Sequence, residues 1–467
     1  MASRSGFSSR LGFVAAAAGS AVGLGNIWSF PYQTGANGGA AFLFIYLAFI
    51  FLIGFPIMVG EIAIGRRTLL NPYGAYKKLG GRSWAWLGFF GVLCGVMILS
   101  FYNVVAGWAF GYFVQIAFGD LLSLGSPEAY GNFFSTYTSN VGNNMGFSLM
   151  FMVITAFIVA RGVQNGIETA AKILMPVLFL ILFGLIIYAL TLPNAMDGVR
   201  FYLQPDFSKI TVKTMYAALG QAFFSLSLGM GALITYGSYI GKKENIVSAG
   251  FIVTLADTSV AFLAGLMILP LVFSQGIEAS GGPGLVFMTL PGVFENMGGM
   301  TGTIIGGAFF LLLSVAALTS TVSLLEVPVS YLVDDKKWGR VKSTLIMALI
   351  VFLFGLPSLL SQGAVSWLTE LTFLCFDGSY PTFLDLIQAA FLEVGLPFGG
   401  FMMSLFISQK WKTSNLAEEI QEGFPNYPGS FIEKFLNFML TWVCPIVLGI
   451  MVIITVLQKF FQIVIIG

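Results

Sequence analysis

The chain has 467 residues, of which 57% are hydrophobic and 9% are charged, and its net charge is +1. Soluble domains carry roughly 25% charged residues, so this composition predicts a polytopic membrane protein. Histidine is absent, which excludes histidine-based catalysis and histidine metal ligation, and the near-neutral charge gives no indication of a nucleic-acid partner. The three cysteines lie far apart in apolar stretches and form neither a zinc spacing nor a disulfide framework.

Apolar stretches of about 20 residues, the length that crosses a bilayer, recur along the chain. They predict eleven spanning helices, and hence an all-α fold, at residues 11–35, 41–66, 85–118, 147–162, 167–191, 214–240, 246–274, 302–333, 341–357, 382–409 and 436–463. Residues 363–376 could form a twelfth span, but this stretch is short and contains Glu370, so a helix in an outer loop is expected.

The placement of lysine and arginine predicts the orientation of these spans. If the N-terminus is cytoplasmic, eleven spans put 18 of the 22 basic residues on the inner side and four on the outer side. This asymmetry agrees with the positive-inside rule. We therefore expect a multi-pass protein of the cell (inner) membrane with its C-terminus outside.

Glycines interrupt the first and sixth spans, at Gly23-Leu24-Gly25 and at Gly229-Met230-Gly231. A break at membrane depth frees backbone N–H and C=O groups, which is tolerated only where a cavity uses them. The spacing of the breaks predicts an inverted repeat of spans 1–5 (11–191) and 6–10 (214–409), with 436–463 as an added helix. A chance pairing is the alternative, because the chain has 56 glycines, but polar residues cluster at both breaks.

The residues around the breaks predict binding of a carboxylate and of hard cations. The half-helix after the first break offers N–H groups and a positive dipole end to an anion. Carbonyls before that break and the side chain of Asn26 offer oxygen to a cation, and Ser225 and Ser227 add hydroxyls beside Phe224. The adjacent Thr319 and Ser320 could complete a cation site, or could merely bond the carbonyl four residues earlier or a neighbouring helix.

Three acidic residues, Asp257, Glu61 and Glu326, lie in predicted spans, where acids are rare and costly. The segment around Asp257 contains no lysine or arginine, so a bound cation is an expected partner. Glu61 and Glu326 are instead expected to accept hydrogen bonds from amides of the broken helices.

Residues 9–39, which include Gly-Leu-Gly-Asn-Ile-Trp-Ser-Phe-Pro-Tyr, and residues 220–229 resemble the first and sixth helices of the neurotransmitter:sodium symporter family. The resemblance covers essentially the whole chain. It implies the LeuT-type fold, a 5+5 inverted repeat with broken helices 1 and 6 and a binding site at the midplane. It also implies two transported sodium ions, no organic cofactor, and a monomer sufficient for transport.

The resemblance also assigns residues to sites. One sodium site is expected at Ala21, Asn26, Ser225, Asp257 and the substrate carboxylate. The second is expected at Gly19, Val22, Ala316, Thr319 and Ser320. The expected substrate contacts are Leu24, Gly25, Tyr102, Phe224, Ser225, Ser227, Met230, Ser320 and Leu324. Tyr102 is expected to bind the substrate carboxylate, and Phe224 to cover the pocket.

Three features refine the expected substrate. Gly23 stands where amine-transporting relatives carry an acid, which favours an amino acid. The pocket is mostly apolar, with the adaptable Met230, which favours neutral hydrophobic or aromatic L-amino acids. Asp257 supplies a negative charge for which animal relatives often use chloride, so chloride independence is expected. A non-transporting amino-acid receptor or sensor is the alternative, and an enzyme is not expected.

Two further groups of residues resemble family elements that open and close the site. Gly166 and Pro176 match a Gly-x9-Pro motif that unwinds the fifth helix on the cytoplasmic side, although a proline early in a helix would look the same. Four residues resemble the inner gate, namely the pair Arg4 and Asp334 with Ser238 and Tyr239 beside it.

The outer gate departs from the family pattern. Ser29 stands where the family has a basic residue, and Gln388 best matches the place of the acid that faces it. A polar or water-mediated outer gate is therefore expected, with Asp385 as a weaker alternative partner.

Overall fold

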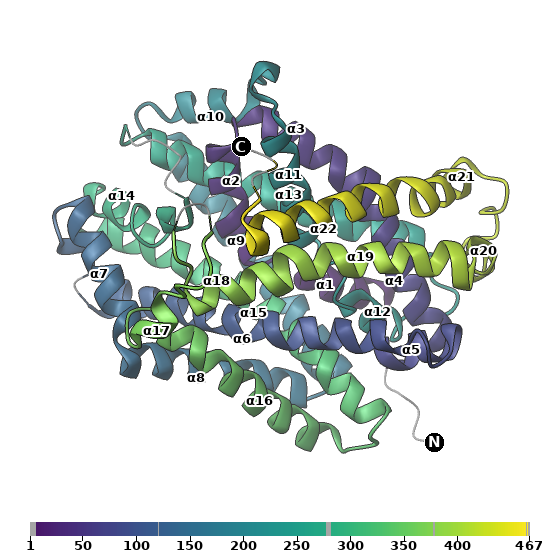
Figure 1. The fold of residues 1–467 in the computed structure, drawn as a ribbon. Coiled ribbons are helices and arrows are strands. Elements are labelled where there is room, and N and C mark those ends of the chain that lie inside the picture. Colours follow the sequence, from purple (N-terminus) through teal and green to yellow (C-terminus); the bar gives the residue numbers. More distant parts are fainter. Residues whose placement is uncertain (1–5, 120, 277–281, 377–378, 464, 466–467) are drawn as a thin grey trace.

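A computed structural model describes residues 6–119, 121–276, 282–376, 379–463 and 465, and this part of the chain is mostly helical and contains no strands. Long helices pack side by side. Short helices lie at the two ends of the bundle, with α7 (Pro127–Ser139), α14 (Leu290–Asn296) and α17 (Ser366–Thr369) at one end and α5 (Pro72–Gly80) and α20 (Thr413–Gln421) at the other (Figure 1). The remaining short elements are η3 (Leu121–Ser123), α10 (Ala195–Leu203), η5 (Phe207–Lys209) and η6 (Gly282–Leu285).

Nine helical stretches among the described residues are long and apolar enough to cross a membrane. Five of them are the single helices α6 (Ala85–Phe118), α8 (Val141–Ala160), α13 (Ile246–Phe273), α15 (Gly299–Asp334) and α16 (Arg340–Leu360). The other four contain π-helical turns: α3 (Ala40–Phe49), η2 (Ile50–Gly54) and α4 (Phe55–Thr68); η4 (Val163–Glu168) and α9 (Thr169–Leu190); α18 (Phe383–Ile387), η7 (Gln388–Val394), α19 (Gly395–Leu405) and η8 (Phe406–Trp411); and α21 (Phe431–Phe438), η9 (Met439–Val443) and α22 (Cys444–Phe461).

Both predicted interruptions are present. α1 (Arg10–Ala21) and the helix formed by η1 (Gly25–Ser29) and α2 (Phe30–Ala36) are bent by 49° at their break. α11 (Val212–Ser225) and α12 (Ala232–Gly237) are separated by residues 226–231, where Gly229 and Gly231 have φ of 86° and 78°. Glycine adopts such angles without steric cost. The predicted count of eleven spans is compatible with nine uninterrupted stretches and these two broken ones.

The structure agrees with the absence of a twelfth span and shifts the start of the fourth. Residues 363–376 contain only the four-residue helix α17, so this stretch is not a twelfth span. The fourth span begins at Val141, six residues earlier than expected. Asn140 caps this helix, because its side chain accepts a hydrogen bond of 3.1 Å from the N–H of Asn143.

One face of α16 is apolar and exposed. Leu345, Leu349 and Leu353 follow one another at four-residue spacing, with 59%, 58% and 50% of their surface accessible. Residues at this spacing share one face of a helix. Such a face is suited to contact with lipid chains, as expected for a membrane span.

Candidate substrate and sodium site

Two cavities lie one beyond the other beside the broken helices. The larger, which we call the vestibule, has a volume of about 700 Å³, and its lining includes Trp28, Tyr32, Gln388 and Lys459. The smaller, which we call the central cavity, has a volume of about 20 Å³. Tyr102 and Phe224 line both cavities and therefore form the partition between them. The central cavity has room for about one water molecule, so it must expand to admit an amino acid.

Most of the predicted substrate contacts line the central cavity: Gly25, Tyr102, Phe224, Ser227, Met230, Ser320 and Leu324. Leu24 lies on the vestibule instead, and its N–H donates a 2.8 Å hydrogen bond to the Tyr102 hydroxyl. The Ser225 side chain belongs to a separate polar cluster. Ile98 and Leu396 also line the cavity; both lie in uninterrupted apolar runs, which carry no signal that would have singled them out.

Gly23 is required by the close approach of three segments at the central cavity. A Cβ atom at this position would lie 2.2 Å from Ser320 Oγ and 2.5 Å from the Tyr102 hydroxyl oxygen. Both distances are far shorter than van der Waals contact. The arrangement therefore has no room for a side chain at position 23, including an acid, unless Ser320 and Tyr102 shift.

The first polar cluster joins the first break to α11 and α13. The Asn26 amide donates to Asp257 Oδ1 (2.7 Å), to the Asp257 carbonyl (3.0 Å) and to Ser225 Oγ (3.0 Å). Ser225 Oγ in turn donates to Asp257 Oδ2 (2.8 Å), and the Gly23 N–H donates to Asn26 Oδ1 (2.9 Å). Ala21 lines the neighbouring central cavity. The structure thus brings together Asn26, Ser225 and Asp257 of one expected sodium site, with Ala21 at the neighbouring cavity.

Asp257 is fully buried, and the side chains that bond it are neutral. A buried carboxylate without a compensating cation is costly. Tyr46, which the sequence did not single out, also reaches this cluster and donates to Ser225 Oγ (3.1 Å). A cation among these oxygens would offset the charge of Asp257.

The second polar cluster joins the first break to α15. Thr319 Oγ1 donates to the carbonyls of Val22 (3.1 Å) and Ala316 (2.9 Å). Ser320 Oγ lies 3.2 Å from the Val22 carbonyl, and a Cβ placed on Gly19 would lie 3.5 Å from Thr319 Cβ. The five residues expected at the second sodium site therefore lie together. All of their oxygens are neutral carbonyl or hydroxyl groups, of the kind that unwound helices offer to sodium.

At the end of the bundle away from the vestibule, the residues expected to gate the site make defined contacts. Arg4 lies outside the described residues. Asp334 Oδ2 accepts from the backbone N–H (3.1 Å) and side-chain amide (3.2 Å) of Asn71. The Tyr239 carbonyl accepts from the N–H of Phe7 (3.1 Å), and Ser238 Oγ donates to the Thr235 carbonyl (2.5 Å). The first described residues, Gly6 and Phe7, thus pack against this end.

The Gly-x9-Pro residues lie at the start of the fifth span. Gly166 is in η4 and Pro176 is in α9. A Cβ on Gly166 would lie 2.0 Å from the Ile158 carbonyl oxygen, so glycine is needed for the close packing of η4 on the end of α8.

At the vestibule, Ser29 bonds neither of its expected partners. Its hydroxyl donates to Gln221 Oε1 (2.7 Å), and the Gln221 amide donates to the Gly25 carbonyl (2.7 Å). Gln388 lines the same vestibule. Asp385 caps its own helix by accepting from the N–H of Thr382 (2.9 Å).

The remaining membrane acids differ from each other. Glu61 Oε1 accepts from the Gly229 N–H (2.8 Å), which confirms the expected contact with a broken-helix amide. The same expectation for Glu326 is wrong. Its carboxylate is paired with the Arg340 guanidinium (2.6 Å) and accepts from the Tyr239 hydroxyl (2.6 Å). A charged partner from the next helix takes the place of the amides.

Comparison with known proteins gives matches along nearly the whole chain. The model of the sodium:neurotransmitter symporter family matches residues 4–127 and 134–464. The uncharacterized sodium-dependent transporter YhdH of Bacillus subtilis (strain 168) is 39% identical over 418 residues, covering 89% of this chain and 90% of that protein. The crystal structure of MhsT in complex with L-phenylalanine has 44% sequence identity and a TM-score of 0.86, and the match covers 96% of this chain and 99% of MhsT.

These matches cover nearly the whole chain and therefore show the family to which the chain belongs. Its members are sodium-coupled transporters and not enzymes, and the apolar spans described above agree with a membrane location. The chain therefore belongs to the sodium:neurotransmitter symporter family and is a multi-pass, sodium-dependent membrane transporter.

Proposed function

We propose that the protein imports neutral hydrophobic and aromatic L-amino acids together with sodium by alternating access. The observation that carries this proposal is the absence of space for a side chain at Gly23, beside an otherwise mostly apolar cavity. A substrate without a carboxylate would find no acid here to pair with its amine. MhsT, which is 44% identical, has been crystallised with L-phenylalanine, and this supports the substrate class.

The substrate carboxylate would lie against the helix that restarts at Gly25, near the Tyr102 hydroxyl. The N-terminal end of a helix favours an anion. The substrate side chain would extend toward Met230, Leu324 and Leu396 after the cavity has widened. Phe224 would close over the bound molecule, because it already separates the cavity from the vestibule.

Two sodium ions would bind at the two polar clusters. At the first, the Asp257 carboxylate would supply the negative charge, so transport would be independent of chloride. At the second, the ion would be held by neutral oxygens alone. This second ion would be released first into the cytoplasm, as η4 and the start of α9 unwind between Gly166 and Pro176.

The direction of transport follows from the proposed orientation. The vestibule would face the outside, and the end where Phe7 contacts Tyr239 would face the cytoplasm. Spans 1–5 and 6–10 would form the two inverted repeats. A monomer contains all of the residues proposed here.

Uptake into proteoliposomes with an inward sodium gradient tests this function. Labelled L-phenylalanine and L-leucine are expected to accumulate, L-glutamate and serotonin are not, and replacing chloride by gluconate is expected to have no effect. Binding of phenylalanine without any uptake would indicate a receptor or sensor and would contradict the proposal.

A further inference from the structure

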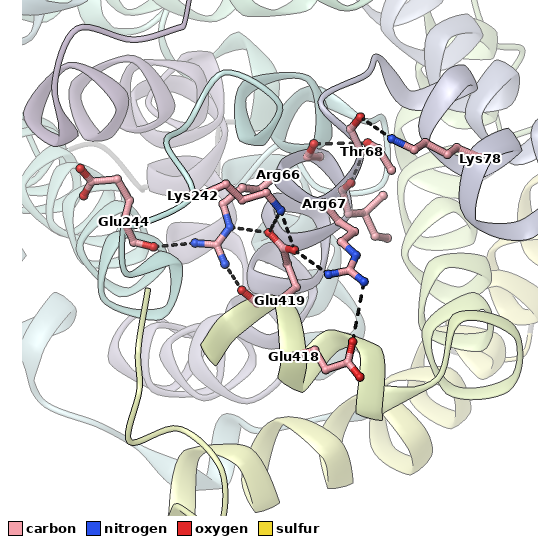
Figure 2. Close-up of polar contacts among 10 residues, drawn as sticks. Arg66, Arg67, Thr68, Lys78, Lys242, Glu244, Glu418 and Glu419 are labelled. Carbon is pink, nitrogen blue, oxygen red and sulfur yellow. Dashed lines mark hydrogen bonds and ion pairs between the residues drawn. The ribbon is translucent and has the colours of Figure 1, made fainter. Parts of the chain in front are cut away.

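A charge cluster with a buried ion pair at its centre lines neither cavity and lies at the end of the bundle that carries α5 and α20 (Figures 1 and 2). Arg66, near the C-terminus of α4, and Glu419, on α20, are both 0% exposed, and Arg66 Nε lies 2.7 Å from Glu419 Oε1. No step proposed above uses this pair.

The Arg66 guanidinium connects three segments of the chain. Besides the Glu419 carboxylate, it donates to the Glu244 carbonyl (2.6 Å), in the turn between α12 and α13, and to the main-chain oxygen of Glu419. Lys242, from the same turn, lies 2.9 Å and 3.0 Å from the two Glu419 oxygens, and Arg67 lies 3.5 Å from one of them. Figure 2 shows Glu419 between these three cations. Removing one partner of a buried ion pair leaves uncompensated charge, which is strongly unfavourable.

Backbone packing joins the same segments into one body. A Cβ on Gly65 would lie 2.0 Å from the Ile234 carbonyl oxygen, and one on Gly237 would lie 2.5 Å from the Ile62 carbonyl oxygen, so α4 and α12 touch without side chains between them. Just after α20, a Cβ on Gly423 would lie 2.0 Å from the Glu244 carbonyl oxygen. We call α4, α12, the turn 241–245 and α20 the Arg66 unit.

A second, partly buried arginine joins a different set of helices. Arg340, at the start of α16, is paired with Glu326 of α15 (2.6 Å) and donates to the Val159 carbonyl at the end of α8 (2.9 Å). Thr155 of α8 also bonds Thr321 of α15 (2.9 Å). We call α8, α15 and α16 the Arg340 unit. In this conformation the hydroxyl of Tyr239, between α12 and the turn 241–245, joins the two units by donating to Glu326 (2.6 Å), so movement of one unit relative to the other would break this hydrogen bond. The Arg340 unit carries Ser320 and Leu324 of the central cavity, whereas α12 of the Arg66 unit follows directly on Met230 and Gly231.

We propose that Arg66 and Glu419 are positioning residues for transport, because they make α20 move with α12 as one body relative to the Arg340 unit. The inference rests on the alternating access proposed above. It assigns the connection between the last two spans, residues 412–430, to the moving half of the sixth span. Loss of the ion pair would leave the central cavity intact and would uncouple this connection from the movement.

Distances between spin labels test the assignment. Labels are placed on the exposed residues Ser414 (α20), Lys243 (the turn), Lys342 (α16) and Arg161 (directly after α8), with the three native cysteines replaced. When L-phenylalanine is added in sodium, the Ser414–Lys342 and Lys243–Lys342 distances are expected to shift in the same direction by similar amounts. The Arg161–Lys342 distance, within one unit, is expected to stay constant.

The outcomes separate this inference from the proposed function. If Lys243–Lys342 shifts and Ser414–Lys342 does not, α20 does not belong to the moving body, and only this inference is overturned. If uptake is absent and neither distance responds, both proposals are overturned.

Substitution of the acid tests its positioning role. Glu419→Gln is expected to lower the maximal uptake rate about tenfold, with the Kd for phenylalanine changed less than twofold, and to abolish the shift at Ser414 only. The matched control is Glu418→Gln. Glu418 is 63% exposed, and its ion pair with Arg67 is long, at 3.7 Å. This variant is expected to change neither the maximal uptake rate nor the Kd for phenylalanine. Arg66→Lys, which keeps the charge but loses the three-way contact, provides a folded variant with an intermediate effect. Equal losses of binding and uptake would indicate a merely structural role and would overturn the inference.

Discussion

The two polar clusters at the first break differ in charge, although both join that break to the hydroxyl groups of another span. The cluster of Asn26, Ser225 and Asp257 contains a fully buried carboxylate, whereas the cluster of Val22, Thr319 and Ser320 has only neutral oxygens. A cation at the first cluster offsets a charge that is otherwise costly. The second cluster has no such requirement. We therefore expect the first site to hold sodium more tightly and the second to release it more readily.

The largest effect is expected for Asp257→Asn, which keeps the shape of the side chain and removes its charge. The sodium concentration for half-maximal uptake should rise about 100-fold, since interactions with a charged group in a buried site are the strong ones. Sodium titrations of uptake measure this effect. Thr258→Ala is the control, because Thr258 is the next residue and donates only to the carbonyl of Thr254 in its own helix. Unchanged sodium dependence in Asp257→Asn would contradict the assignment.

Gly23→Ala tests the close packing at the central cavity, which lies between the two clusters. The added methyl group would collide with Ser320 and Tyr102, and overpacking of this kind costs about 1–3 kcal/mol. We expect the Kd for phenylalanine to rise about 30-fold, as measured by equilibrium binding. Gly184→Ala on α9 is the control, because a Cβ there meets nothing within 4 Å. Wild-type affinity in Gly23→Ala would show that the cavity does not close as described.

Thr319→Val tests the second cluster, whose oxygens are all neutral. The substitution preserves volume and removes one neutral ligand, so the half-saturating sodium concentration should rise only about fivefold, in line with about 1 kcal/mol for a neutral hydrogen-bonding group. Ser323→Ala is the control. Ser323 lies one turn after Ser320 in α15, and its hydroxyl donates to the Ser320 carbonyl within that helix. An effect as large as that of Asp257→Asn would remove the proposed difference between the sites.

The smallest effect is expected for Pro176→Ala. Alanine supplies a backbone N–H that can bond the carbonyl four residues earlier, which should oppose unwinding at the start of α9. Uptake should slow about threefold without a change in equilibrium binding. Pro357→Ala in α16 is the control. Gly166→Ala is less informative, because the added Cβ would meet the Ile158 carbonyl directly. Faster uptake in Pro176→Ala would contradict the proposed release step.

The sequence predicted the interruptions of the first and sixth spans, because glycine and polar residues at membrane depth form a local pattern that few other structures explain. The resemblance to the family then predicted which residues lie together, including Asn26 with Asp257. The partners of Ser29 and Glu326 were not predictable in this way. Each bonds a residue from another helix, Gln221 or Arg340, and pairing between helices depends on their packing, which no local pattern records.

The sequence also did not predict all of the residues that line the central cavity. Ile98 and Leu396 look like any other apolar residues of a membrane span, and only the packing places them at the cavity. The buried Arg66–Glu419 pair is a similar case, since its members are 353 positions apart in the sequence.

The most direct test of the account is the linkage between sodium and substrate at equilibrium. If the substrate carboxylate completes the sodium site at Asp257, each ligand must strengthen binding of the other by the same factor. We predict that saturating L-phenylalanine lowers the half-saturating sodium concentration and that saturating sodium lowers the Kd for phenylalanine. With two sodium ions bound, the Kd for phenylalanine should fall by the same factor as the product of the two sodium dissociation constants. Both effects should persist without chloride. Independent binding of the two ligands, or a requirement for chloride, would contradict the account.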